Sequence, residues 1–203
     1  MCGRFTVRNT QEIQCEHGVT VEASFNTAPS HTVLTVTDKA KMMKWSYNPT
    51  WAKKPMNIIN ARSETLNEKP SFKMAKRCTI VADGWFEWHR KGDKKQPYFF
   101  HLNNNIFLFA GIYNEYQGVN GCAIITKKAN ENLGQVHHRM PILLENNEAR
   151  NWLQGEDVYA SNLSEQIEYY PVSTMVNSPR NNNEACVNQH KQKRETTQNA
   201  ESL

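Results

Sequence analysis

The alternation of apolar and polar residues predicts short β-strands along most of the chain. Residues 32–37 alternate and are rich in β-branched side chains, and residues 78–82 form a short apolar run. Residues 98–101 and 106–113 predict a strand pair joined by three asparagines. Further strands are expected within residues 42–51, 58–59, 123–126 and 169–176. We therefore expect an α+β fold with a mainly antiparallel, barrel-like β-sheet core and a few short helices.

Short helices are predicted over residues 10–17, 69–76 and 147–153. The first has Asn9 or Thr10 as its N-cap and Gly18 at its end. The third should bury Trp152.

The last part of the chain differs in composition. From about Asn181 it is rich in Asn, Gln, Lys and Glu and lacks apolar periodicity, which is typical of a flexible segment. The chain of 203 residues is long enough to bury one core. We expect one folded domain over residues 1–187 and a polar tail over residues 188–203.

Composition argues against a membrane-spanning, secreted, disulfide-rich or zinc-binding protein. No apolar run approaches the roughly 18 residues of a membrane span, and Arg4, Arg8 and Glu12 interrupt any early signal sequence. The five cysteines are scattered without a CxxC pair, which favours neither a disulfide framework nor a zinc site and suits a reducing compartment. The net charge of +4 is compatible with a polyanionic partner and equally with ordinary surface lysines.

Cys2 is the first candidate for chemistry. Removal of Met1 would leave a free α-amine and a thiol on adjacent carbons, with ordinary pKa values of about 7.7–8.0 and 8.5. The amine can add to an aldehyde, after which the thiolate closes on the imine to give a thiazolidine. Alternatively, the thiol attacks an acyl carbon with the amine as its base. The alternative is a buried cysteine that follows an intact Met1.

Two further segments carry polar groups beside apolar runs. Asn60 and Arg62 are two apart in an extended segment, so their side chains share one face. Arg62 suits a phosphate, or an ion pair with Glu64. Glu87 lies among aromatic residues, where burial would raise its pKa towards neutrality and suit it to proton transfer. The alternative is an exposed glutamate in an alternating strand.

Aromatic rings and histidines add two more candidates. Trp45 and Trp51 flank a proline-containing loop and can form a stacking platform for nucleobases, although Trp45 is better suited to the core. His137 and His138 are adjacent in a segment expected to be extended, so we expect their side chains to face opposite ways.

Taken in order, these segments resemble the SRAP family of SOS-response-associated, abasic-site-processing proteins. Two positions depart from the family pattern: Ser46 stands where the family usually has Gly, and Trp85 where it often has Phe or another aromatic residue. The resemblance covers roughly residues 1–187. The matching segments are MCGRF (1–5), FNTAP (25–29), residues 43–52, NARSET (60–65), DGWFEW (83–88), HHRMP (137–141) and residues 172–177.

The resemblance implies the SRAP fold, binding to single-stranded DNA and covalent capture of abasic sites. It implies that Cys2 becomes the thiazolidine and that Asn60 holds the N-terminal residue by hydrogen bonds. It implies that Glu87 shuttles protons and that His137, rather than His138, is the general acid/base. It also implies that DNA is contacted by a set of six residues: Gly3, Arg4, Trp51, Arg62, Trp88 and Arg139.

The family's peptidase label concerns removal of residues before Cys2, and only Met1 precedes it here. Imine chemistry requires no metal or organic cofactor. We expect a monomer, located in the cytoplasm and associated with the nucleoid in a bacterium, or located in the nucleus in a eukaryote. Two alternatives remain: an N-terminal-nucleophile hydrolase similar to class II glutamine amidotransferases, and a non-covalent single-strand DNA-binding module.

Overall fold

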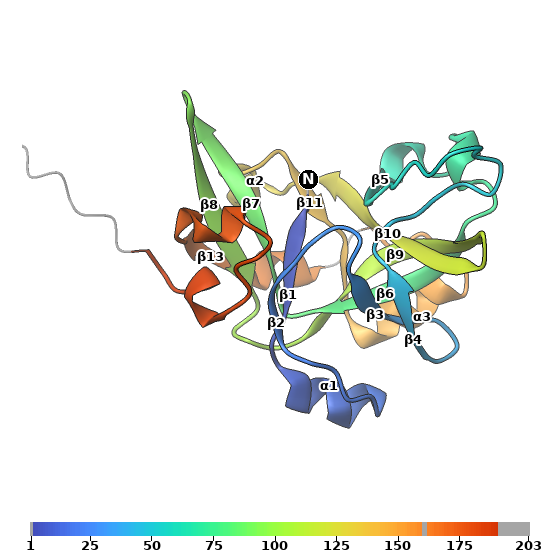
Figure 1. Cartoon of the computed structure of the whole chain (residues 1–203), viewed down its shortest axis with the longest axis horizontal. Helices are drawn as coiled ribbons and strands as arrows, with labels where there is room; N and C mark the ends of the chain where they lie inside the picture. The colour runs from blue at the N-terminus through green and yellow to red at the C-terminus, as the bar shows by residue number, and fades with distance from the viewer. Residues whose placement is uncertain (1, 160–161, 191–203) are drawn as a thin grey trace, which may run out of the picture.

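A closed five-stranded β-barrel forms the centre of the computed structural model, which describes residues 2–159 and 162–190 (Figure 1). The barrel order is β10-β4-β3-β6-β9, and it closes because β9 also pairs with β10. Its pairs are antiparallel except β10 with β4. The expected barrel-like, mainly antiparallel core is thus confirmed. The barrel strands are β3 (Thr32–Val36), β4 (Ala40–Lys44), β6 (Lys76–Ala82), β9 (Phe107–Tyr116) and β10 (Val119–Lys128).

A second, five-stranded sheet carries the N-terminus. Its order is β13-β8-β7-β1-β2, and every pair is antiparallel. Its strands are β1 (Arg4–Val7), β2 (Ser24–Thr27), β7 (Gly84–Lys91), β8 (Lys94–His101) and β13 (Glu168–Pro171). Three short strands extend the barrel: β5 (Asn60–Arg62), β11 (Arg139–Pro141) and β12 (Leu143–Leu144).

The helices are short and lie outside the sheets. In the described residues they are α1 (Thr10–His17), α2 (Glu131–Gly134) and α3 (Asn146–Leu153), with single 3-10 turns η1 (Ser63–Thr65), η2 (Pro70–Phe72), η3 (Asn162–Gln166), η4 (Thr174–Asn177) and η5 (Glu184–Cys186). The predicted caps of α1 are confirmed: Asn9 accepts a hydrogen bond from the backbone of Glu12, and Gly18 is left-handed with φ 65°. The predicted burial of Trp152 on α3 is also confirmed. No helix in this part of the chain is long and apolar enough to cross a membrane.

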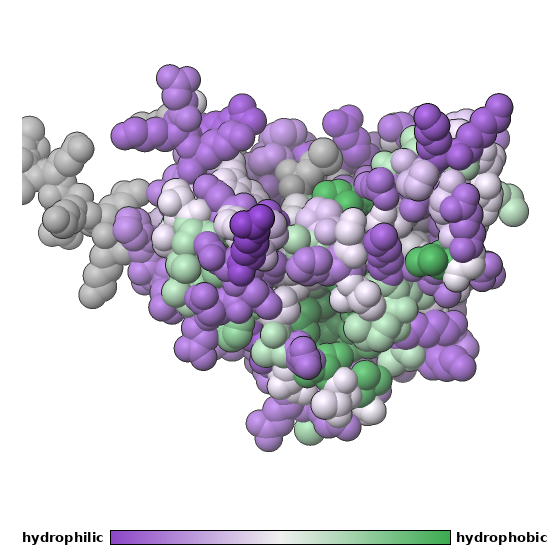
Figure 2. Space-filling model, viewed as in Figure 1, coloured by the Kyte–Doolittle hydropathy of each residue, from purple (hydrophilic) through white to green (hydrophobic). Residues whose placement is uncertain are grey.

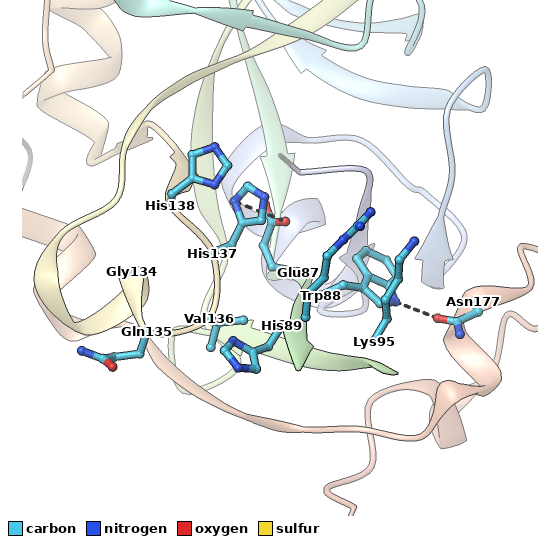
Figure 3. A pocket seen from close by; sticks show the side chains of 11 residues that line it. Glu87, Trp88, His89, Lys95, Gly134, Gln135, Val136, His137, His138 and Asn177 are labelled. Carbon is cyan, nitrogen blue, oxygen red and sulfur yellow. Dashed lines mark hydrogen bonds and ion pairs between the residues drawn. The ribbon is translucent and has the colours of Figure 1, made fainter. Parts of the chain in front are cut away.

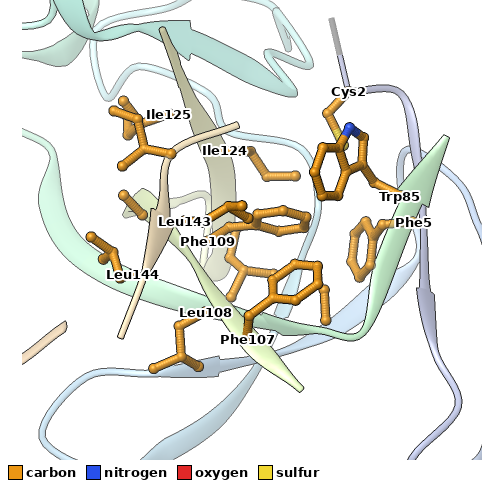
Figure 4. Close-up of a cluster of buried hydrophobic side chains, with 14 of the residues drawn as sticks. Cys2, Phe5, Trp85, Phe107, Leu108, Phe109, Ile124, Ile125, Leu143 and Leu144 are labelled. Atoms are coloured by element: carbon orange, nitrogen blue, oxygen red, sulfur yellow. The ribbon is translucent and has the colours of Figure 1, made fainter. Parts of the chain in front are cut away.

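Aromatic side chains join the barrel to the second sheet (Figure 4). Phe5 of β1 packs edge-on against Trp45, with ring centroids 4.9 Å apart, and against Phe109 at 5.9 Å. Trp85 of β7 packs edge-on against Phe107 and Phe109 of the barrel strand β9, with ring centroids 5.9 and 6.1 Å apart. These rings are almost fully buried, so Trp45 belongs to the core, as expected. Strand β1 is therefore held against the barrel by Phe5 and paired with β2 and β7 on its two edges, and Cys2 directly precedes it.

Two predictions of local structure are wrong. Residues 98–101 and 106–113 do form strands, but β8 pairs with β7 and β13 while β9 pairs with β6, β10 and β12. Asn103 and Asn104, both with positive φ, turn the chain from one sheet into the other. The helix expected over residues 69–76 is only the 3-10 turn η2, which starts at Pro70, because the chain already enters strand β6 at Lys76.

The C-terminal segment folds back over β1 and β2. The strand expected over residues 169–176 ends at Pro171 and continues into η4. Beyond Asn181, where a flexible segment was expected, the side chain of Asn182 accepts hydrogen bonds from the backbone of Phe25 and Asn26 at 2.7 and 2.9 Å, and Cys186 is fully buried. Most of the predicted tail over residues 188–203 lies outside the described residues.

Candidate active site

Strand β1 places Cys2 beside Glu87. The register between β1 and β7 sets Arg4 opposite Phe86, and one more step along the strands brings Gly3 opposite Glu87. Cys2 is 0% exposed, and its Sγ lies 3.8 Å from the carbonyl oxygen of Arg4. Burial, followed by the negative charge of Glu87, raises the pKa of the Cys2 thiol. The predicted nucleophile and the predicted proton carrier are therefore in one electrostatic environment.

Asn60 holds the backbone of Cys2. Strand β5 pairs in parallel with β10, which sets Asn60 beside Ile124. Asn60 Nδ2 donates a hydrogen bond to the carbonyl oxygen of Cys2 at 2.7 Å, so the structure contains the contact that the resemblance implied. Asn60 Oδ1 is buried and accepts no hydrogen bond within the described residues. An unsatisfied buried acceptor costs about 1–3 kcal/mol, so this oxygen offers a position for an additional donor close to Cys2.

Glu87 and His137 lie close together, and their pKa values are shifted in opposite directions (Figure 3). Glu87 is 2% exposed, and burial raises the pKa of its carboxyl to about 7. Its Oε2 lies 3.9 Å from Nδ1 of His137. Burial lowers the pKa of His137 to about 4, and its Nδ1 accepts the backbone N–H of Arg139 at 3.0 Å. Near neutral pH, Glu87 exchanges a proton readily and His137 is a neutral base.

The expectation that His137 and His138 face opposite ways is wrong. Their rings stack, with centroids 4.4 Å apart and an interplanar angle of 27°. The segment is not yet extended at this point, because the N–H of His137 still bonds to the carbonyl of Leu133 at 3.3 Å, and β11 begins only at Arg139. Both imidazoles therefore reach the same cavity.

A cavity of about 910 Å³ opens beside these residues. Cys2 is not among its lining residues, so the thiol lies deeper than the cavity wall. The lining comes from β7, the start of β8, the segment from α2 to His138, and η4: Glu87, Trp88, His89, Arg90, Lys95, Gly134, Gln135, Val136, His137, His138 and Asn177.

The guanidinium group of Arg4 donates hydrogen bonds to other groups of the protein. Its Nη1 donates to Asn26 Oδ1 at 3.0 Å and to the carbonyl of Val176 at 2.8 Å, and its Nη2 donates to the carbonyl of Asn177 at 3.3 Å. Asn26 in turn donates from Nδ2 to the carbonyls of Val176, Ser178 and Asn181. Arg4 thus fixes the segment that carries Asn177 against β1, a structural use that the sequence did not reveal.

The guanidinium group of Arg139 also has partners within the protein. It forms a bidentate ion pair with Glu64, with distances of 2.6 and 2.9 Å, and donates to the carbonyl of Thr126 at 2.6 Å. The carboxylate at position 64, considered as a partner for Arg62, therefore pairs with Arg139 instead. Arg62 is exposed and forms no ion pair within the described residues.

The two tryptophans that the resemblance implies for DNA binding differ in position: Trp51 is on the surface and Trp88 lines the cavity. Trp51 is 58% exposed, and its Nε1 lies 3.5 Å from the carbonyl of Pro70. Trp88 lines the cavity, and its Nε1 donates to Asn177 Oδ1 at 2.7 Å. Gly3 is half-buried between Cys2 and β1. Sequence reasoning missed Asn26 and Asn177, although both lie in segments that carried the family resemblance.

Comparisons with known proteins identify the family of the chain. The family model for SOS response associated peptidase (SRAP) matches residues 1–179. Abasic site processing protein YoqW of Bacillus subtilis is 34% identical over 94% of this chain and 100% of its own length. Abasic site processing protein YedK of Escherichia coli is 30% identical over 89% of this chain and 96% of its own length. Abasic site processing protein HMCES of Gallus gallus is 32% identical over 71% of this chain and 56% of its own length.

A solved structure extends the comparison to the fold. A crystal structure of a Bacteroides thetaiotaomicron protein superposes with a TM-score of 0.78 at 22% identity, covering 94% of this chain and 100% of that one. The barrel and the second sheet are therefore shared with an experimentally determined fold. Together with the match over residues 1–179, this shows that the chain belongs to the SRAP family.

Proposed function

We propose that this protein recognises abasic sites in single-stranded DNA and captures them covalently through Cys2. The observation that carries the proposal is the cluster of Cys2, Asn60, Glu87 and His137 at one end of β1. Relatives named abasic site processing proteins support abasic DNA as the substrate.

The chemistry follows from the two nucleophiles of an N-terminal cysteine. Removal of Met1 frees the α-amine of Cys2. This amine attacks C1′ of the ring-opened abasic deoxyribose, and loss of one water gives an imine. The thiolate of Cys2 then adds to the imine carbon, the nitrogen takes up a proton, and the thiazolidine ring closes. Free protein and aldehyde therefore differ from the adduct by one water.

Glu87 suits the proton transfers of this sequence. An acid/base group is most effective when its pKa is close to the working pH, and burial holds Glu87 at about 7. In its protonated form it donates to the sugar oxygen as the ring opens, and as the carboxylate it takes a proton from the attacking amine.

His137 supplies the complementary base. Its pKa of about 4 leaves it neutral at physiological pH. Two neighbouring groups with pKa values pushed apart are typical of an acid and base pair. Asn60 keeps the Cys2 backbone still, and its buried Oδ1 is suited to accept a hydrogen bond from the freed α-amine.

Single-stranded DNA would reach the site across the cavity. The exposed ring of Trp51 is available to stack on a base, and the exposed cation of Arg62 is available to a phosphate. Arg4 and Arg139, whose guanidinium groups already have protein partners, would act mainly by holding Asn177 and β11 in place.

The experiment is incubation with a single-stranded oligonucleotide that contains one abasic site, followed by denaturing electrophoresis. Wild-type protein should give an adduct that survives heat. Cys2→Ala and Cys2→Ser both keep the amine and lose the thiol, so each should give no heat-stable adduct and only an imine that borohydride traps. A heat-stable adduct with Cys2→Ala would contradict the proposal. Hydrolysis of glutamine by wild-type protein without any adduct would favour the amidotransferase-like alternative.

A further inference from the structure

The arginines nearest the cavity fall into two groups by their partners. Arg4 and Arg139 bond to acceptors within the protein, as described above. Arg90 is different, and so is Lys95 opposite it. Both are exposed, both line the cavity, and within the described residues neither forms an ion pair or a side-chain hydrogen bond. These two cations remain available to an external anion.

The β7–β8 hairpin places the two cations and a tryptophan on one face. Arg90 is the direct cross-strand partner of Lys95, and Trp88 is the partner of Pro97. Directly opposed residues in an antiparallel pair point to the same side, and so do residues two apart in one strand. Trp88, Arg90 and Lys95 therefore form a continuous surface, here called the hairpin face. Trp88 and Lys95 lie beside one another in Figure 3.

The hairpin projects away from the rest of the molecule (Figure 1). Strongly hydrophilic side chains gather in the same region of the surface (Figure 2). Between Trp88 and His101 the sequence has one acid, Asp93 at the turn, against four Lys and Arg residues. The local field at the hairpin is therefore positive and attracts anions.

Trp88 gives this surface a fixed ring. Its Nε1 donates to Asn177 Oδ1 at 2.7 Å, and the carbonyl of Asn177 is bound by Arg4 at 3.3 Å. An indole held in one orientation loses little freedom when a base stacks on it. A stacking ring beside free cations is the combination that binds single-stranded nucleic acid without reading its sequence.

We propose that the hairpin face binds the DNA strand on one side of the abasic nucleotide, with Arg90 and Lys95 on its phosphates. The proposal rests on the proposed function for its substrate. Alternation turns the side chain of Glu87 to the other face of β7, but Glu87 and Arg90 both line the cavity. At about 3.3 Å per residue, Arg90 lies about 10 Å along β7 from Glu87. Stacked nucleotides advance about 3.4 Å each, so the contacts fall within about three nucleotides of the lesion.

The test uses a single-stranded oligonucleotide with a tetrahydrofuran analogue of the abasic site, which has no aldehyde and cannot be captured. Binding is measured by fluorescence anisotropy over a range of salt concentrations. Each phosphate contact on a single strand contributes about 0.7 to the slope of log K against log salt. The double variant R90A/K95A should lower the slope by about 1.4. The loss of affinity between 50 and 200 mM salt should then be about sevenfold smaller than in wild type.

Two controls make the result specific. The matched variant K39A/K76A removes two exposed lysines, one in the turn between β3 and β4 and one at the start of β6, and should leave the slope unchanged. The conservative exchange R90K/K95R should retain the wild-type slope, because both positions keep a cation. Shortening the oligonucleotide to the lesion on one side should weaken wild-type binding and have little effect on R90A/K95A, whereas shortening the other side should affect both proteins equally.

A slope that is the same in R90A/K95A and wild type would overturn the inference. A fall of equal size in K39A/K76A would overturn it too, because the effect would then be one of net charge. These outcomes are separate from the chemistry. Covalent capture with an unchanged slope would contradict only the hairpin face, and a lower slope without capture would contradict only the proposed function.

Discussion

Glu87→Gln should make the protein more stable and less active. The substitution keeps the shape of a buried side chain that is 2% exposed, replaces one carboxyl oxygen by an NH2 donor, and removes the ability to ionise. Burial raises the pKa of Glu87 from 4.5 to about 7. The wild-type fold therefore has to bury a charge above neutral pH, and the variant does not.

The sign and size of the stability effect follow from proton linkage. The folded state holds the Glu87 proton more tightly than the unfolded chain, so stability is full below about pH 4.5 and falls as the pH rises through about 7. A shift of about 2.5 pKa units at about 1.36 kcal/mol each gives a total loss of about 3 kcal/mol. About 2.5 kcal/mol of this falls between pH 5 and pH 8.

The assay is urea unfolding of wild type and Glu87→Gln at both pH values. The advantage of the variant should grow by about 2.5 kcal/mol from pH 5 to pH 8, or about 5–10 °C in Tm for a chain of this size. Glu115→Gln, at an exposed position of β9, is the matched control and should show no such growth. Both proteins must carry the same N-terminus, checked by mass, because the charge of the α-amino group lowers the pKa of Glu87.

The rate of covalent capture should fall in Glu87→Gln, although its stability rises. Loss of a positioned acid/base typically costs about 10²–10⁴-fold in rate, so capture by Glu87→Gln at pH 7 should be slower by that factor. A variant whose stability advantage is the same at pH 5 and pH 8 would refute the raised pKa. Capture at the wild-type rate would refute the role in proton transfer.

Three further substitutions test other parts of the site. His137→Ala should slow capture by about 10²-fold or more, and the inflection near pH 7 that Glu87 gives the wild-type rate should persist in this variant, because the pKa of His137 is about 4. Glu64→Ala should free Arg139 for a phosphate and raise the salt slope of single-strand binding by about 0.7, at a cost of at most about 1 kcal/mol in urea unfolding because the carboxylate is exposed. Asn26→Ala should lower the free energy of unfolding by about 1–3 kcal/mol, because buried carbonyls lose their donor.

Local structure was predictable where local physics decides it. Helix α1 has a side-chain N-cap at Asn9 and a left-handed glycine at its end, both visible in the sequence. Strand β3 follows its β-branched alternation, and the core position of Trp45 follows its apolar surroundings. The barrel-like fold class was predictable because the sequence indicates more strands than helices.

Pairing between strands could not be predicted in the same way. Strands β8 and β9 are neighbours in sequence and look like a hairpin, yet they belong to different sheets because the turn at Asn103 and Asn104 redirects the chain. Nothing in the two apolar runs distinguishes these outcomes. Pairing depends on which faces find partners elsewhere, a property of the whole core.

The polar C-terminal segment shows a second limit. Its order comes from side-chain amides on backbone groups, such as Asn182 on β2, rather than from apolar periodicity. Individual site residues were identifiable from their chemistry and their motifs. The sequence could not show that Arg4 and Arg139 have protein partners whereas Arg90 has none among the described residues, because ion pairs depend on distances set by the fold.

The central claim is that Cys2 joins an abasic site through its amine and its thiol. Intact mass spectrometry after incubation with an abasic single-stranded oligonucleotide tests it most directly. After heating that hydrolyses any imine, which has the same minus-water signature, the account predicts a species with the mass of the protein lacking Met1, plus the oligonucleotide, minus one water, and no such species with Cys2→Ala. An adduct that retains Met1, or an equal adduct with Cys2→Ala, would contradict it.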